Sequence, residues 1–334
     1  MELQQLSSLT ASLIKAPVEQ VLEIEVVVRD LIQRRVAEAR LAQRTTVAIT
    51  ARRCPHCATE NARLFGKDKN GRQRFRCVNA DCRRTYNILT GTPMARARKP
   101  EQWARYLGYM SSHLSIRKII DTGMEISHRT AFRWRHRFLE AAQGQNAAML
   151  SGVIEADETF FVQSFKGSRG WKRGMPPAAR AARPSAWGAL LRGLSHEQVP
   201  VLTALDNAGG VYEAVLPSRS AIEPALDGRV AAGSVLCSDG AKAYVKAAVK
   251  AGAEHRRVFI GRPDHATKMA GKPRRPKGRL GLGHVNAHHG RLKKFINERC
   301  NGIATKYPGS YLAWNRAMGR DSFTGSVLLD YALA

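Results

Sequence analysis

The chain has few acidic residues for its number of basic ones. Asp and Glu together number 27, against 54 Lys and Arg, which gives a formal net charge of +27. A compact monomer with this charge repels itself unless a polyanion neutralises it, and an isoelectric point near 10.6 is typical of nucleic-acid binders. A ribosomal or histone-like structural protein has the same balance, but the apolar residues here reach 44% and are spread along the chain.

Long hydrophobic runs are also missing. No stretch of the 334 residues is long and apolar enough to cross a bilayer. The N-terminal sequence MELQQLSSLTASLIKAPVEQ lacks the basic start and apolar run of a secretory signal. The sequence therefore predicts a cytoplasmic, nucleoid-associated protein without a membrane partner, and its length allows two or three domains.

Cysteine is scarce, and four of the six cysteines fall within one short stretch. Cys54 and Cys57 form a C-x2-C pair, and Cys77 and Cys82 follow at the distance expected of a second pair. In a reducing compartment such clustering indicates metal rather than disulfides, and four thiolates form a closed, structural zinc site. The polar turn residues around Gly71 fit a β-hairpin. We expect a zinc ribbon over residues 51–92 that lies on DNA; four unrelated structural cysteines are the alternative.

Two helical segments flank this ribbon. Residues 1–50 mix apolar and charged residues without Gly, and we expect a helical arm that either packs or mediates oligomerisation. In residues 98–145 a break at Gly123 and an N-cap candidate at Ser127 precede a basic amphipathic helix, as in a helix-turn-helix. An ordinary helical hairpin is the alternative. The candidate DNA-binding side chains of this helix are Arg129, Arg133, Arg135 and Arg137.

From residue 151 onward, short apolar runs alternate with helical patterns, which predicts an α/β domain. The run VIEADETFFV places Asp157 on a strand beside Glu158, and since neighbours on a strand point to opposite faces, one of the two faces a given site. Asp239 ends the run VLCSD. Carboxylates at strand ends commonly hold Mg²⁺ or Mn²⁺. Two basic segments, 166–185 and 261–283, are either solvated loops or contacts to nucleic-acid backbone.

Taken together, the motifs resemble a family of insertion-sequence transposases. The matching pieces occur in family order from about residue 50 to 318: CPHC with its two later cysteines, TAFRWRHR, EADETFF followed by KGSRG, SDGAKAY, and HVNAHHGRLKKFINERCNGIATKYPGSYLAWNRA. The resemblance implies a ribonuclease H-like mixed sheet with helices, of the DDE superfamily, over residues 151–320. It also implies that Asp157 and Asp239 are the first two catalytic carboxylates.

The third member departs from the family's Asp-Asp-Glu pattern. Where the HVN-x-x-E arrangement has its acid, this chain has His289. Val285, Leu292 and Ile296 predict an apolar helix face on which His289 lies, and His288 lies nearly as close, so spacing alone does not choose between them. Imidazole can bind a divalent metal or act as a base. Glu298, the nearest downstream acid, would point to the opposite side of the helix.

The resemblance implies a metal-dependent DNA cleavage and strand-transfer enzyme. Its partners would be double-stranded DNA, both terminal inverted repeats and target, and other copies of itself in a homo-oligomer. Zn²⁺ would be structural, and Mg²⁺ or Mn²⁺ at Asp157, Asp239 and His289 would be catalytic. The alternatives are a catalytically decayed DNA-binding regulator and a ribonuclease H-like repair nuclease. Further candidate phosphate contacts are Lys166, Arg169, Lys172, Lys293 and Lys294.

Overall fold

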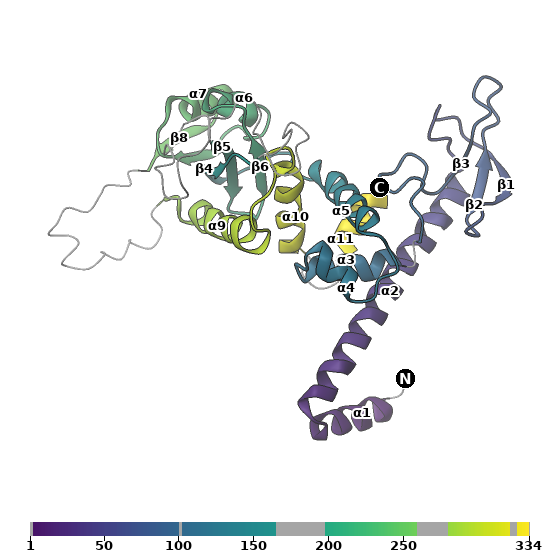
Figure 1. Cartoon of the computed structure of the whole chain (residues 1–334). Coiled ribbons are helices and arrows are strands. Elements are labelled where there is room, and N and C mark those ends of the chain that lie inside the picture. Colours follow the sequence, from purple (N-terminus) through teal and green to yellow (C-terminus); the bar gives the residue numbers. More distant parts are fainter. Residues whose placement is uncertain (1–2, 100–101, 165–197, 259–279, 321–325, 334) are drawn as a thin grey trace, which may run out of the picture. The chain divides into compact units, whose positions relative to one another are not determined.

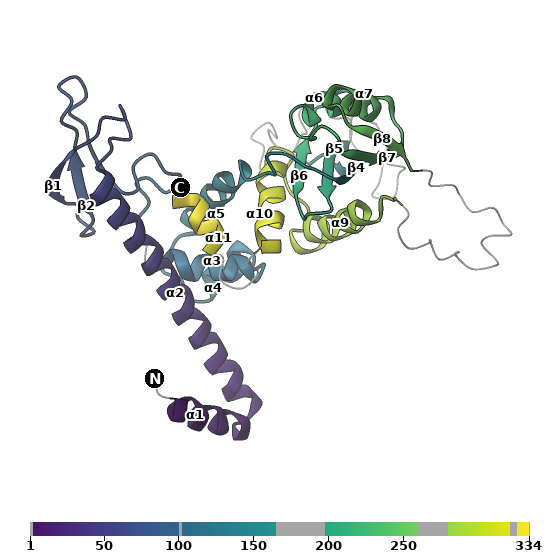
Figure 2. The same ribbon diagram turned by 180° about the vertical axis from the view of Figure 1, so that it is seen from behind.

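The computed structural model describes residues 3–99, 102–164, 198–258, 280–320 and 326–333 (Figures 1 and 2). The chain divides into two compact units: one contains residues 1–142 and 316–334, and the other residues 143–315. Within the described residues, no helix combines the length and the apolar character needed to span a membrane.

The first unit begins with a long helical arm and a small sheet. Helix α1 (Leu3–Lys15) precedes α2 (Val18–Ala51), a helix of 34 residues that starts after Pro17 and ends where Arg52 turns to a positive φ of 42°. Both lie in the segment predicted to be helical. Three short strands follow in an antiparallel sheet of order β1-β2-β3. They are β1 (Arg63–Lys67), β2 (Gln73–Arg76) and β3 (Thr85–Asn87).

Three further helices complete the predicted helical region: α3 (Trp103–Ser111), α4 (Ile116–Asp121) and α5 (His128–Gln143). Their packing is aromatic, because the Trp134 ring makes edge contacts with Trp103 and Tyr106 at centroid distances of 6.4 and 5.6 Å. Two predicted boundaries are confirmed. Gly123 takes a φ of +80° between α4 and α5, and the Ser127 hydroxyl accepts a hydrogen bond from the Thr130 amide at the start of α5.

The last helix of the chain returns to this unit. Helix α11 (Ser326–Leu333) packs against α2 and α3, and its Asp330 carboxylate lies 2.9 Å from the Arg40 guanidinium of α2. The first unit is therefore built from both ends of the chain.

The second unit is a mixed α/β structure around a five-stranded sheet of order β6-β5-β4-β7-β8. Strands β4, β5 and β6 are antiparallel, whereas β7 runs parallel to β4 and β8 parallel to β7. This outcome confirms the α/β prediction and the strands expected around Asp157 and before Asp239. The strands are β4 (Val153–Val162), β5 (Gln198–Asp206), β6 (Val211–Val215), β7 (Val235–Ser238) and β8 (Glu254–Arg257).

Helices cover both faces of this sheet (Figure 1). Helix α7 and the short α6, preceded by a 3-10 turn, cover one face, where Ile154 and Ala156 of β4 pack around Tyr244. Helix α9 covers the other face, where Val285 packs against Cys237. The bounds are Arg219–Ala221 for the 3-10 turn, Ile222–Leu226 for α6, Lys242–Ala251 for α7 and Gly283–Lys293 for α9. A π-helical turn (Lys294–Arg299) and α10 (Pro308–Arg320) follow.

Some sequence predictions fall outside the described residues. They include the basic segment 166–185 with Lys166, Arg169 and Lys172, the strand expected in SAWGALLRGL, and most of the basic segment 261–283.

Candidate functional site

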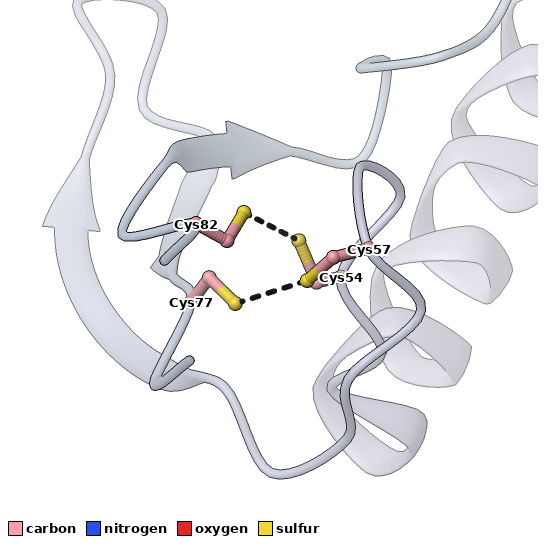
Figure 3. Close-up of side chains that lie close together, drawn as sticks. All are labelled: Cys54, Cys57, Cys77 and Cys82. Atoms are coloured by element: carbon pink, nitrogen blue, oxygen red, sulfur yellow. Dashed lines mark hydrogen bonds between the residues drawn. The ribbon is translucent and has the colours of Figure 1, made fainter. Parts of the chain in front are cut away.

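The four clustered cysteines come together at one point of the first unit (Figure 3). The Cys54 and Cys82 sulfurs are 3.9 Å apart, the Cys57 and Cys77 sulfurs are 3.5 Å apart, and all four Sγ atoms lie within 4.8 Å of one another. Four thiolates at about 2.3 Å from a tetrahedral Zn²⁺ would be separated by about 3.8 Å. The cluster therefore fits a four-cysteine zinc site, as the spacing predicts.

The two pairs of cysteines lie in two similar turns of the backbone. The Ala58 amide donates to the Cys54 carbonyl, and the Arg83 amide donates to the Asn79 carbonyl. Ala58 and Arg83, each placed directly after the last cysteine of its pair, have positive φ values of 59° and 42°. The left-handed residue reverses the chain so that both sulfurs of a pair face inward. His56 is exposed and is not a member of the sulfur cluster.

The thiols of the cluster have unequal electrostatic surroundings. Hydrogen bonds with the hydroxyl and backbone of Thr59 lower the pKa of Cys57 to about 6. Burial raises the pKa of Cys77 to about 12. Phe75 and Tyr86, which are paired on neighbouring strands of the small sheet, stack with ring centroids 5.2 Å apart. Thiolates are the form that binds zinc, so a bound cation would favour deprotonation of the whole set.

The candidate DNA-binding arginines of α5 separate into two groups. Arg129 and Arg133 are exposed and one helical turn apart. Arg135 is buried, and its guanidinium donates to the Leu114 carbonyl. Arg137 is half-buried and donates to the Ala95 carbonyl. The first two are available to a ligand, whereas the other two hold the helical region together.

The two predicted aspartates lie on or directly after neighbouring parallel strands. Glu155 of β4 pairs in parallel with Cys237 of β7. Asp157 lies two residues further along β4, and Asp239 directly follows Ser238, the last residue of β7, in a bend beyond the paired residues. The pKa of Tyr244 is raised by burial and then by the negative charges of Glu158, Asp157 and Asp239.

Helix α9 is fixed over this face by two buried acids that the sequence did not single out. The Glu155 carboxylate accepts hydrogen bonds from the His284 and Val285 amides at 2.8 and 3.0 Å, and its other oxygen lies 2.7 Å from His284 Nδ1. An acid at a helix N-terminus satisfies free amides and favours the helix dipole. Further along, His288 Nε2 lies 2.8 Å from Glu213 Oε1, with both side chains buried.

Because the start of α9 contacts Glu155 of β4 and its His288 contacts Glu213 of β6, the helix extends across the sheet from β4 toward β6. Asp157 pairs with Thr203, and Thr203 pairs with Glu213, so Asp157 and Glu213 stand about 10 Å apart by strand spacing. The sequence signal for Glu213 was one acid in the apolar strand VYEAV. Its partner His288 is 75 residues away along the chain, and no local pattern predicts that pairing.

His289 faces inward, as the helical periodicity predicts, and is 6% exposed. Its Nε2 atom has no hydrogen-bond partner among the described residues. Burial, followed by the charges of His288 and Lys293, lowers the pKa of His289 to about 4. Within the described ranges, His289 does not join Asp157 and Asp239 in a group compact enough to share one metal ion. Glu298 is exposed, in agreement with its predicted orientation, and Lys293 and Lys294 are also exposed.

Comparisons with known proteins give little guidance. No protein-family model matches the chain, and no curated protein is detectably similar. Among solved structures, a chain of the cryo-EM structure of simian T-cell lymphotropic virus intasome in complex with PP2A regulatory subunit B56 gamma is similar over 62% of this chain, with 11% sequence identity and a TM-score of 0.27. The similarity covers 65% of that chain, less than two thirds of it. A TM-score this low establishes no common fold.

Proposed function

We propose that the protein is a DDE-type transposase that binds the ends of its insertion sequence and performs metal-dependent DNA cleavage and strand transfer. The observation that carries the proposal is the pair of carboxylates, Asp157 on β4 and Asp239 directly after the neighbouring parallel strand β7. The order of the sheet, three antiparallel strands followed by two parallel ones, supports a ribonuclease H-like domain. The cysteine cluster and the exposed arginines of α5 support a zinc-ribbon and helix-turn-helix region for DNA binding.

In this proposal each site residue has a defined role. Mg²⁺ or Mn²⁺ held by Asp157 and Asp239 would supply Lewis-acid stabilisation for phosphoryl transfer. The third group is His289, whose unpartnered Nε2 atom is a free ligand position, and α9 would have to move to bring it to the two acids. His288 is engaged with Glu213, which favours His289 as the third residue.

The reaction has two stages in this proposal. Water first attacks the phosphodiester at the element end and frees a 3′-hydroxyl. That hydroxyl then attacks a target phosphodiester, so that a new phosphodiester joins the element to the target while the target's P–O3′ bond breaks and leaves a free 3′-hydroxyl on the target strand. The exposed Lys293 and Lys294 are candidate phosphate contacts beside α9. A homo-oligomer would hold the two element ends together.

Strand transfer in vitro tests the proposal. The purified chain would be given a duplex of its element end, a target plasmid and either Mg²⁺ or Mn²⁺. We expect joined products that are absent with Asp157→Asn and Asp239→Asn, while end binding persists. Glu298→Gln is the matched control, because this exposed acid lies outside the carboxylate pair. Joining that survives both aspartate substitutions would refute the assignment.

A second candidate is a DNA-binding regulator derived from a transposase. The observation that favours it is the histidine at position 289, which among the described residues forms no group with the two aspartates compact enough to share one metal ion. Tight end binding without cleavage in either metal would support this candidate. His289→Glu would then be expected to restore metal-dependent cleavage if the missing acid is the sole defect.

A further inference from the structure

A basic cavity of about 550 Å³ opens between the start of α5 and the linker that joins the cysteine-bearing sheet to α3. Among the residues that line it are five cations and one acid, Glu125. The cations are Arg96, Arg98, Lys99, Arg133 and Arg137. A second cavity of about 470 Å³ is also lined by Arg96 and Arg98, together with residues of the cysteine-bearing sheet and its turns that include Asp68. The linker thus presents cations to two adjoining hollows.

This linker is held in place by contacts along its length. Its Ala95 carbonyl accepts a hydrogen bond from Arg137 of α5, and its Arg98 carbonyl accepts one from the Trp103 indole of α3. Ala97 is buried between two exposed arginines. Arg96 and Lys99 have positive φ values of 59° and 53°. Non-glycine residues keep such a conformation where surrounding contacts impose it, and they cluster at functional sites.

The cationic side chains of the linker differ in whether they form hydrogen bonds or ion pairs. Lys99 donates to the Glu125 carbonyl and lies 3.5 Å from the Glu125 carboxylate. Arg96, Arg98 and Arg133 are exposed, and within the described residues their guanidinium groups form no hydrogen bond or ion pair. Three unneutralised cations that converge on one hollow produce a positive potential and attract an anion. Arginine suits phosphate in particular, because its planar fork donates two parallel hydrogen bonds.

We propose that this cavity is a binding groove for the phosphodiester backbone of double-stranded DNA, with Arg96 and Arg98 as its principal contacts. The inference rests on the proposed DNA-binding function and extends it to the linker, which no motif marks as a site. Exposed Arg133 of α5 lines the same groove, so a strand that follows the linker would continue onto the helix. Phosphate contacts of this kind fix the position of a protein on DNA and carry no sequence information.

The test measures DNA affinity as a function of salt concentration. Fluorescence anisotropy with the full chain and a labelled duplex would compare the wild type with the double variant Arg96→Gln/Arg98→Gln. Each lost phosphate contact lowers the slope of log affinity against log salt by about 0.9. We expect the magnitude of this slope to be smaller by about 2 in the double variant, and its affinity at low salt to be at least about tenfold weaker. Both changes should be equal for element-end and unrelated duplexes.

Two further variants serve as controls. Arg35→Gln/Lys246→Gln removes two exposed cations elsewhere in the chain and should leave the slope nearly unchanged. Arg96→Lys/Arg98→Lys keeps the charge and should retain most of the slope, which separates charge loss from misfolding.

The outcomes separate the groove from the broader function. If Arg96→Gln/Arg98→Gln keeps the wild-type slope of log affinity against log salt, the proposed groove is refuted and the transposase proposal stays intact. Absence of duplex binding by the wild type would overturn both. If the double variant instead loses affinity for poly-glutamate while binding the duplex normally, the groove binds an acidic protein segment and the proposal is wrong.

Discussion

Glu213 and His288 form a buried pair in which each group depends on the other. Their side chains are 0% and 9% exposed, and the Glu213 backbone is bonded at both its amide and its carbonyl by the Asn146 side chain. Removing one partner of a buried pair leaves a polar group without compensation, which costs about 3 kcal/mol or more. The pair therefore ties α9 to β6 strongly.

We expect Glu213→Ala to lower the free energy of unfolding of the second unit by about 3 kcal/mol. Urea unfolding followed by far-ultraviolet circular dichroism measures this change. The matched control is His284→Ala, whose side chain is 89% exposed although it also contacts an acid, and a surface pair contributes about 1 kcal/mol at most. If Glu213→Ala and His284→Ala lower the free energy of unfolding equally, the stabilising role of the buried Glu213–His288 pair is contradicted.

Single residues also show what sequence reasoning can and cannot reach. Ser127, Gly123 and Gly71 were identifiable because caps and turns depend on local backbone chemistry. Glu155 was not, because its partners on α9 are 129 and 130 residues away. Arg135 was a candidate DNA-binding residue, and its buried guanidinium instead donates to the Leu114 carbonyl, a contact that periodicity does not reveal.

At the scale of elements, the cysteine-bearing sheet is small, and we expect its stability to depend on a metal ion bound by the four cysteines. Strands β1, β2 and β3 are five, four and three residues long, and Phe75 and Tyr86 provide most of the aromatic packing beneath them. So small a sheet buries little apolar surface, and structural zinc commonly supplies the folding energy in such modules.

We predict one Zn²⁺ per chain, lost on treatment with a strong chelator or in Cys77→Ser. Hydrogen exchange should then show loss of amide protection in β1–β3, with protection retained in β4 and β5, because those strands lie in the other unit. Cys237→Ser is the control, since this buried cysteine lies outside the cluster. Retained protection of β1–β3 in a zinc-free protein would show that the sheet is independent of metal.

Helix α2 has an apolar side that its own unit leaves uncovered. Leu22, Val26 and Val27 are 59%, 59% and 66% exposed, and apolar surface of this kind commonly marks an interface. We expect Leu22→Gln/Val26→Gln to weaken the proposed homo-oligomer and to leave the helical content unchanged. Light scattering coupled to size exclusion would measure the mass.

Glu19→Gln/Glu23→Gln serves as the control for α2, because these exposed residues have the same spacing on the same helix. An identical mass for the wild type and the apolar variant, over a range of concentrations, would exclude α2 as the interface.

At the scale of the whole molecule, the net charge of +27 opposes compaction. Salt screens such repulsion, and a bound polyanion neutralises it. We predict that duplex DNA raises the melting temperature at low salt, by the equivalent of about 2.7 kcal/mol at a hundredfold excess over the dissociation constant. The increase should shrink at high salt. Differential scanning fluorimetry at two salt concentrations measures both effects, and a DNA-induced shift that is independent of salt would argue against electrostatic binding.

The α/β character of the second unit followed from the alternation of strands and helices, and β4 occupies the segment predicted for it. The parallel pairing of β4, which carries Asp157, with β7, which Asp239 follows, needed the structure, because 82 residues separate the two acids along the chain and a parallel pairing leaves no mark at either end. The position of His289 relative to these acids likewise depends on the path of α9, which Glu155 and Glu213 determine.

The return of α11 to the first unit has a consequence for synthesis on the ribosome. Residues 143–315 form the other unit, so they emerge before the helix that packs on α2 and α3 exists. Until then, the surfaces of α2 and α3 that α11 covers, including Arg40, face the solvent or a chaperone. A nascent or prematurely terminated chain would carry the cysteine cluster and α5 without this last support. The completed first unit is therefore available only after the whole second unit has been translated.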